Sequence, residues 1–189
     1  MVKKIALGLA ALIVVLVIVI ATRPAEFSVA RSRTVAASPQ VVFAWLDDFH
    51  HWQAWSPWEK LDPDMKRELS GATAGPGAAY HWVGNDKVGE GRMTITDSQP
   101  PRSVTIHLEF LKPFAATNTT VFELAPSGAG TTVTWRMSGH NNFVAKAFSL
   151  IMNMDATVGP DFERGLANLD AATAAAAGTG AAPSAPPGA

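Results

Sequence analysis

The hydrophobic and polar positions divide the chain into an apolar run at its start, a long series of alternating segments, and an apolar stripe at helical spacing near its end. The first part, Ile5–Ala21, contains no charged and no strongly polar residue. As an α-helix it would be about 25 Å long, a little short of the ~30 Å hydrocarbon core of a bilayer. Lys4 and Thr22 at its ends can make up the difference. The run therefore predicts one membrane-spanning helix.

A cleaved secretory signal is the alternative for this run, because it also combines a basic start with an apolar stretch. The hydrophobic region of a signal is usually about 7–15 residues long and ends in a small-x-small cleavage site. Here the run is longer and leads into Ala21-Thr22-Arg23-Pro24, where a charge and a proline stand in the place of that site. We therefore favour an anchor that stays attached.

The charges around the run bear on which way it crosses the membrane. Lys3 and Lys4 favour an N-terminus inside the cell, whereas Arg23, Arg31 and Arg33 lie on the far side of the run. The last two fall in a predicted strand, and folded domains are translocated in spite of their charge. We therefore expect a single-pass membrane protein whose domain lies on the extracytoplasmic side.

Strands are expected wherever apolar and polar residues alternate. One such segment, 27–36, is followed by Ser38-Pro39, which is typical of a helix start, and by a second short helix over 49–58 that Pro57 interrupts. Short turns then separate six further alternating segments, which cover residues 65–70, 78–84, 89–97, 102–111, 114–124 and 131–138. This regular spacing predicts one antiparallel sheet.

The alternation gives the predicted sheet one apolar face. Val104, Ile106 and Leu108, for example, lie on one side of their strand. The segment long enough to cover that face is the last predicted helix, 143–172, which carries an apolar stripe. Gly159-Pro160 interrupts the stripe and should kink the helix, unless a separate helical segment begins at Pro160.

Composition divides the chain into an anchor (1–25), one domain (26–172) and an Ala/Pro/Gly tail (173–189) that lacks aromatic residues and is expected to be disordered. The net charge is −1, from 15 basic and 16 acidic residues without a basic stripe, so nucleic acid is not an expected partner. The chain has no cysteine, which excludes disulfides, thiolate catalysis and zinc–thiolate sites.

The sequence lacks the common motifs of catalysis and cofactor binding. It contains no Gly-x-Ser-x-Gly motif and no P-loop, and Gly89-x-Gly91 lacks the third glycine of a dinucleotide fingerprint. Asp47-Asp48-Phe49-His50-His51 invites a metal site, but successive helical residues point about 100° apart and no His-x-x-x-His spacing occurs. We interpret this segment as a polar cap, and expect neither a metal nor a cofactor.

Several weak motifs occur together in a characteristic order: Ser38-Pro39-x-x-Val42-Phe43, Trp52-x-x-Trp55-Ser56-Pro57-Trp58, Tyr80-x-Trp82-x-Gly84, Phe110-x-x-Pro113-Phe114 and Gly159-Pro160-Asp161-Phe162. Over residues 26–170 the chain resembles the SRPBCC (START-like, or Bet v 1-like) superfamily, and within it the bacterial polyketide cyclase/dehydrase-like group. The resemblance implies an α+β helix-grip fold, in which a curved antiparallel sheet of about seven strands surrounds a long C-terminal helix, with two short helices after the first strand.

That fold implies an apolar cavity between the sheet and the long helix. Our first hypothesis is therefore a membrane-anchored protein that binds a hydrophobic small molecule, lipid-like or polyketide-like. Its expected ligand-binding residues are Tyr80, Trp82, Met93, Ile95, Ile106, Leu108, Phe110, Phe122, Trp135, Met137, Phe148, Ile151 and Asp155. The alternatives are a cyclase or dehydratase that works in the same cavity and an interaction module without a cavity. The sequence leaves the oligomeric state open.

Few polar residues share the apolar positions. Asp155 lies on the apolar stripe of the last helix, where a buried carboxylate is costly unless it is paired or takes part in chemistry. Tyr80 and Trp82 share one strand face and could orient a ligand through their OH and NH groups. Asp155 and Tyr80 are therefore the candidate catalytic residues for the enzyme hypothesis. The Trp52/Trp55/Trp58 series is expected in the core, with an aromatic rim at the cavity entrance or at the lipid interface as the alternative.

Overall fold

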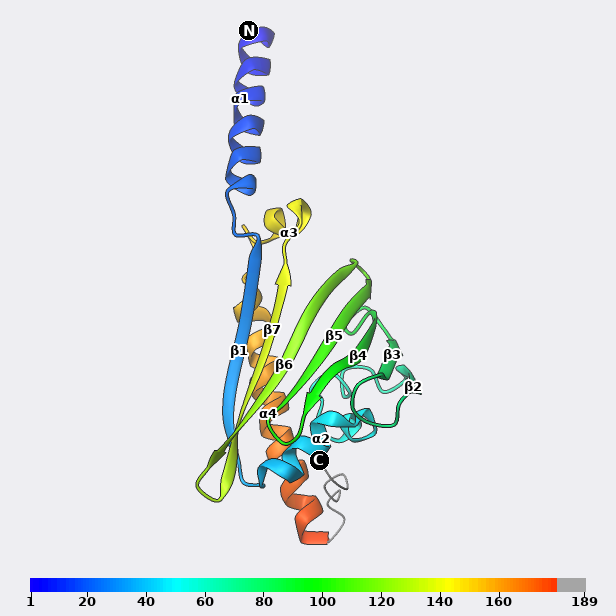
Figure 1. Cartoon of the computed structure of the whole chain (residues 1–189). Coiled ribbons are helices and arrows are strands. Elements are labelled where there is room, and N and C mark those ends of the chain that lie inside the picture. The colour runs from blue at the N-terminus through cyan, green and yellow to red at the C-terminus, as the bar shows by residue number, and fades with distance from the viewer. Residues whose placement is uncertain (180–189) are drawn as a thin grey trace.

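The structure is a computed structural model that describes residues 1–179. Helix α1 (Val2–Ala21) projects from a domain in which a curved sheet partly surrounds a second long helix, α4 (Met154–Thr179) (Figure 1). Nearly all side chains of α1 are exposed, and the helix is long and apolar enough to cross a membrane, a property that signal sequences share.

The sheet contains seven antiparallel strands in the order β1-β7-β6-β5-β4-β3-β2. Their bounds are Glu26–Val35 (β1), Lys66–Gly71 (β2), Ala78–Val83 (β3), Glu90–Gln99 (β4), Ser103–Lys112 (β5), Ala116–Ser127 (β6) and Gly130–His140 (β7). The first and last strands pair along their whole length, from Glu26 opposite His140 to Val35 opposite Thr131. The predicted seven-stranded antiparallel sheet is therefore confirmed.

Two short helices connect β1 to β2, as the sequence predicts. Helix α2 (Pro39–Asp47) begins at its proline, and Ser38 occupies the N-cap position, although its side chain makes no capping hydrogen bond. Asp48 follows α2 and is the N-cap of the 3-10 helix η1 (Phe49–Ala54). Its side chain accepts a hydrogen bond from the backbone N–H of His50. The second helix is thus shorter than expected and ends before Pro57.

The single helix predicted over 143–172 is two helices in the structure, α3 (Phe143–Phe148) and α4 (Met154–Thr179). Each begins at an asparagine: Asn142 Oδ1 accepts the N–H of Ala145 at 2.9 Å, and Asn153 Oδ1 accepts the N–H of Asp155 at 3.0 Å. Asparagine is among the best N-cap residues, so these two caps separate the helices.

Helix α4 also differs from the prediction along its length. It passes through Pro160, so no separate segment begins at the proline. Its described part runs beyond Ala172 as far as Thr179, and Thr173 is buried. Residues 173–179 are therefore helical instead of belonging to the predicted tail, and the rest of that tail, 180–189, lies outside the described residues.

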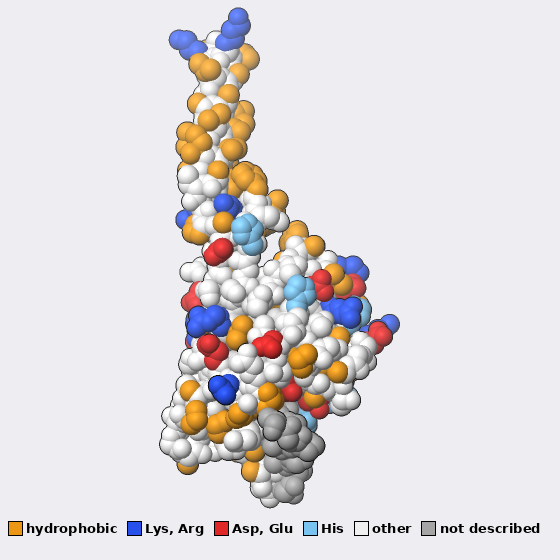
Figure 2. Space-filling view, in the orientation of Figure 1, with side chains coloured by type: hydrophobic (Ala, Val, Ile, Leu, Met, Phe, Trp, Pro, Cys, Tyr) orange, Lys and Arg blue, Asp and Glu red, His pale blue; other side chains and the backbone are white. Residues whose placement is uncertain are grey.

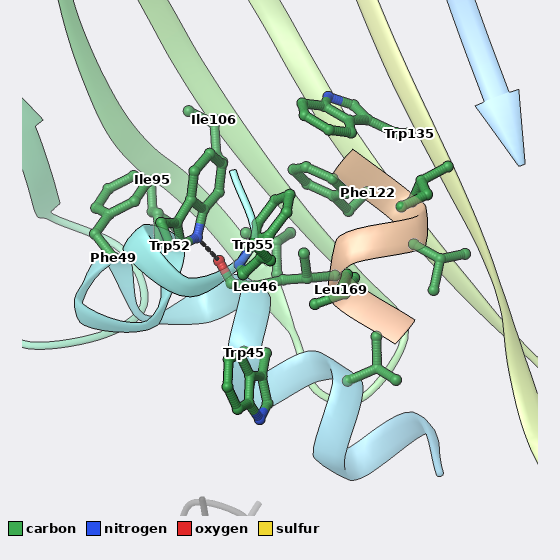
Figure 3. Packing of buried hydrophobic residues seen from close by; sticks show 14 of the residues in the cluster. Trp45, Leu46, Phe49, Trp52, Trp55, Ile95, Ile106, Phe122, Trp135 and Leu169 are labelled. Carbon is green, nitrogen blue, oxygen red and sulfur yellow. Dashed lines mark hydrogen bonds between the residues drawn. The ribbon is translucent and has the colours of Figure 1, made fainter. Parts of the chain in front are cut away.

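The core between the sheet and the helices is built on aromatic rings (Figure 3). Trp55 from the segment after η1 is completely buried and lies edge-on to Phe122 of β6, with the ring centroids 6.0 Å apart. Trp135 of β7 stacks on Phe162 of α4 at 4.2 Å and 7°. Gly165 lets α4 come this close, because a Cβ there would lie 2.7 Å from the Trp135 ring.

Candidate functional site

A cavity of about 140 Å³ lies between the concave face of the sheet, the first half of α4 and the segment after η1. Its lining is almost entirely apolar. The side chains around it come from η1 and the segment after it, from strands β3 to β7 with the β3–β4 turn, and from α4: Trp52, Ser56, Trp58, Glu59, Met65, Tyr80, Trp82, Lys87, Val88, Met93, Leu108, Phe110, Thr120, Trp135, Met137, Val158 and Phe162.

The structure brings seven of the predicted ligand-binding residues together around this cavity: Tyr80, Trp82, Met93, Leu108, Phe110, Trp135 and Met137. Ile95, Ile106 and Phe122 share the same sheet face but do not line it. All three are completely or almost completely buried in the core cluster that contains α2 and η1. Their role is therefore packing.

The other three predicted residues lie on the outside of the molecule, which corrects the prediction. Phe148 is 43% exposed and Ile151 is 85% exposed. The Asp155 side chain is 54% exposed. The prediction assumed one continuous helical stripe, and the break at 149–153 shifts the helical phase, so residues before the break do not continue the buried face of α4.

Asp155 is paired outside the cavity. Its two carboxylate oxygens accept hydrogen bonds from the guanidinium of Arg31 on β1, at 2.7 and 3.0 Å. The Arg31 hydrogen bond lowers the pKa of Asp155. The guanidinium also lies against Gly159, where a Cβ would collide with it. Asp155 thus helps to attach α4 to β1 and does not face the cavity as a catalytic group would.

The polar group that the sequence reasoning missed is Glu59. Tyr80 Oη donates a hydrogen bond to Glu59 Oε1 at 2.7 Å, and Arg67 Nε donates to Glu59 Oε2 at 2.6 Å. The Glu59 side chain is only 7% exposed. A buried carboxylate needs such partners, so these three side chains form one connected network at the cavity wall.

The network fixes the state of Tyr80. Burial, and next the hydrogen bond to Glu59, raise the pKa of the Tyr80 hydroxyl. The hydroxyl therefore stays protonated and donates to Glu59, and its oxygen, which also interacts with the Arg67 guanidinium, can still accept a hydrogen bond. The useful signal in the sequence was Glu59 itself, an acidic residue directly after the tryptophan series, but its partner Arg67 lies on a different element and no spacing connects them.

Two indole N–H groups at the cavity differ in their hydrogen bonding. Trp82 Nε1 donates to the carbonyl of Val88 at 3.0 Å, so it is not available to orient a ligand as predicted. Trp135 Nε1 is buried and has no hydrogen-bond partner among residues 1–179. Gly91 lies opposite Trp82 and makes room for the Trp82 ring, because a Cβ at Gly91 would collide with that ring.

The three tryptophans that follow α2 divide between the core and the cavity. Trp52 and Trp55 are buried, and Trp52 Nε1 donates to the carbonyl of Leu46 at 3.1 Å (Figure 3). Trp58 is half-buried, lines the cavity and lies edge-on to Trp135 at 5.7 Å. Both interpretations therefore apply: Trp55 packs in the core, Trp58 lines the cavity, and Trp52 does both.

The acidic and histidine-rich segment forms the junction between α2 and η1. Asp47 is buried and accepts a hydrogen bond from the Ser98 hydroxyl, and Asp48 pairs with His50 Nδ1 at 2.6 Å. Burial raises the pKa of Asp47, while the Ser98 hydrogen bond opposes that rise. Within residues 1–179 no three His, Asp or Glu side chains gather closely enough to hold a metal ion.

Comparison with solved structures shows the same fold in proteins of very different sequence. Protein MLL2253 from Mesorhizobium loti aligns with a TM-score of 0.57 at 15% identity, over 79% of this chain and 98% of that chain. Protein CV1439 from Chromobacterium violaceum gives 0.55 at 15% identity, over 76% and 95%. Ara h 8.0201 gives 0.54 at 12% identity, over 82% and 99%. Identities this low show the shared fold alone.

Comparison with curated protein sequences found no match. A family model described as "Polyketide cyclase / dehydrase and lipid transport" matches residues 26–174, which contain the whole sheet and every residue around the cavity. Sequence, fold and cavity therefore agree, and the chain belongs to this polyketide cyclase/dehydrase and lipid transport family of the SRPBCC, or Bet v 1-like, superfamily.

Proposed function

We propose that this protein is tethered to a membrane by α1 and binds a hydrophobic small molecule in its cavity. The apolar cavity is the observation that carries the proposal. Its volume of about 140 Å³ is close to the ~150 Å³ of a dry apolar cavity that binds benzene. The enclosed space therefore suits one ring or a short acyl segment, and a longer ligand would extend past the half-buried Phe110 and Val158.

The polar groups at the wall favour a ligand that is apolar with one polar end. The Tyr80 hydroxyl can accept one hydrogen bond, and Lys87, which is exposed, offers a positive charge at the edge of the cavity. A pure hydrocarbon would use neither group. A lipid-like or polyketide-like molecule with a hydroxyl or carboxylate end fits both.

The same geometry supports binding better than catalysis. Both carboxylate oxygens of Glu59 accept hydrogen bonds, from Tyr80 and from Arg67, so the carboxylate is engaged in the wall of the cavity. The raised pKa of Tyr80 makes its hydroxyl a weak acid. Asp155, the other candidate, lies outside the cavity.

The proposed tether rests on the length and composition of α1 and on the way it joins the domain. Arg23 Nη2 donates to the Ser149 carbonyl at 3.1 Å, and Lys146 Nζ donates to the carbonyl of Ala21 at 3.4 Å. Ile20 is buried. These contacts attach the end of α1 to the region around α3, which favours a retained anchor over a cleaved signal. We place the domain on the extracytoplasmic side.

The proposal is tested by ligand uptake. The full chain, delipidated in detergent, is incubated with a fatty acid, an isoprenoid alcohol and a polycyclic aromatic, and its complexes are measured by native mass spectrometry. Thr120→Phe places a ring in the cavity, whereas Thr119→Phe makes the same change at the neighbouring exposed position on the outer face. We expect uptake by the wild type and by Thr119→Phe and none by Thr120→Phe. No uptake of any probe by the wild type would contradict the proposal.

A further inference from the structure

The end of the domain from which α1 emerges carries most of the exposed apolar surface. Among the described residues that follow α1, twelve large hydrophobic residues are exposed, and nine of them lie at this end: Leu111, Phe114, Phe143, Val144, Phe148, Leu150, Ile151, Met152 and Met154. Figure 2 shows hydrophobic side chains gathered over α3, at the foot of α1. We call these nine residues the α3 surface.

The α3 surface is continuous across two separate parts of the fold. Phe114, in the turn between β5 and β6, contacts Phe148 of α3, with the ring centroids 5.8 Å apart. The β6–β7 and β1–β7 registers place that turn and the start of β1 at the same end of the sheet. Soluble monomeric proteins rarely expose contiguous apolar patches of this kind unless the patch binds something.

We propose that the α3 surface sits in the interfacial layer of the same bilayer that α1 crosses. The inference rests on the proposed tethering through α1. Only residues 22–25 separate α1 from β1, and four residues span at most about 14 Å even when extended. The domain therefore cannot move away from the bilayer surface, and α3 touches the end of α1 directly.

The charges around the α3 surface fit an interfacial position. Arg23 and Lys146 lie where α1 meets α3, and Lys112 lies at the β5 end of the surface, where it pairs with Glu90 at 2.6 Å. Basic side chains at this level can reach lipid phosphates while the apolar residues enter the acyl boundary.

The α3 surface also adjoins the cavity. Val158, which lines the cavity, lies one helical turn after Met154, and Phe110 lies directly before Leu111 in β5. With the surface in the lipid interface, the edge of the cavity formed by Phe110 and Val158 lies beside the bilayer. A hydrophobic ligand then moves between the bilayer and the cavity with little exposure to water.

The absence of cysteine makes a direct test possible, because each introduced cysteine carries the only spin label. Phe114→Cys and Ile151→Cys, both at exposed positions, report on the α3 surface. Ala129→Cys, exposed in the β6–β7 turn at the opposite end of the sheet, is the control, and Val14→Cys reports on the middle of α1. Each full-length variant is reconstituted in vesicles of phosphatidylcholine and phosphatidylglycerol, and its accessibility to oxygen and to a water-soluble nickel chelate is measured.

We expect the oxygen-to-nickel accessibility ratio at positions 114 and 151 to exceed that at 129 several-fold, with position 14 deepest. Ratios at 114 and 151 equal to that at 129, with 14 deep, would overturn the proposal and leave the tether intact. A water-exposed label at 14 would overturn the tether and this proposal together. Spin–spin broadening at 114 or 151 that disappears on dilution with unlabelled chain would assign the surface to a second copy, and would also overturn it.

Discussion

The concave face of the sheet is filled at one end and hollow at the other, although the same strands form both ends. On β4 and β5, Ile95 pairs with Ile106 and both are almost completely buried. Two residues further along, Met93 pairs with Leu108, and both line the cavity. The strands change little in hydrophobicity between these positions. What changes is the layer above them.

That layer is dense at the filled end. Leu46 from α2 and Trp55 from the segment after η1 are completely buried there, and Trp55 lies edge-on to Phe122. At the hollow end the cover includes Trp58 and, from the first turns of α4, Val158, both half-buried, beside the buried Trp52 and Phe162. The cavity is therefore produced by a gap in the covering layer, and its walls are the ordinary apolar face of a sheet.

The largest expected effect is a difference in the stability that is lost when a tryptophan is removed from each of the two ends. Trp55→Ala removes a completely buried ring and should lower the free energy of unfolding by about 3–5 kcal/mol, because the packed layer cannot close over the space. Trp58→Ala removes a half-buried cavity wall, so its cost should be clearly smaller. Urea unfolding of both variants measures the difference. Equal losses would show that the hollow end is packed as tightly as the filled end.

A smaller effect is expected from the polar network of the hollow end. Tyr80→Phe removes one hydrogen bond to Glu59 and should cost about 0.5–1.5 kcal/mol. It also removes the acceptor that we assign to the polar end of the ligand. The affinity for a fatty acid or alcohol should therefore fall more than the affinity for a hydrocarbon of the same length, as measured by titration. Equal changes in affinity for both probes would show that Tyr80 does not take part in ligand recognition.

The smallest effect concerns Asp47, which joins α2 to Ser98 at the filled end. Burial raises the pKa of Asp47 in the folded protein above its unfolded value of 3.8. Asp47 therefore adds stability at low pH, and that stability is lost as the pH rises above 3.8 and through the folded pKa. Asp47→Asn keeps an acceptor for Ser98 without the charge. Relative to that variant, the wild type should lose stability as pH rises from about 4 towards neutrality. Parallel stability curves for the two proteins would contradict this.

Alternation and turn residues were enough to predict the sheet, the two helices before β2 and the covering helix. They were enough because period-2 hydrophobicity reports directly on which face is buried. The same pattern could not tell Ile95 and Ile106 from Met93 and Leu108, since all four are apolar residues on the inward face. The difference depends on the length and position of the covering helices, which the strands do not encode.

The error over Phe148, Ile151 and Asp155 has a local cause. The helical spacing through residues 143–172 predicts one helix, whereas Asn142 and Asn153 each cap a separate one. An asparagine followed two residues later by an aspartate is typical of a helix start, so Asn153 is the signal in the sequence that divides the stripe. Glu59 was missed for another reason: its partners Tyr80 and Arg67 become neighbours only when β2 and β3 pair.

The most direct test of the account asks whether a hydrophobic ligand enters the hollow end. A fatty acid brominated along its chain quenches tryptophan at short range, and Trp58, Trp82 and Trp135 all line the cavity. Titration of the delipidated full chain should give saturable quenching in the wild type and in Thr119→Phe, and none in Thr120→Phe. Absence of saturable quenching in the wild type, or equal quenching in Thr120→Phe, would contradict the proposal that this cavity binds the ligand.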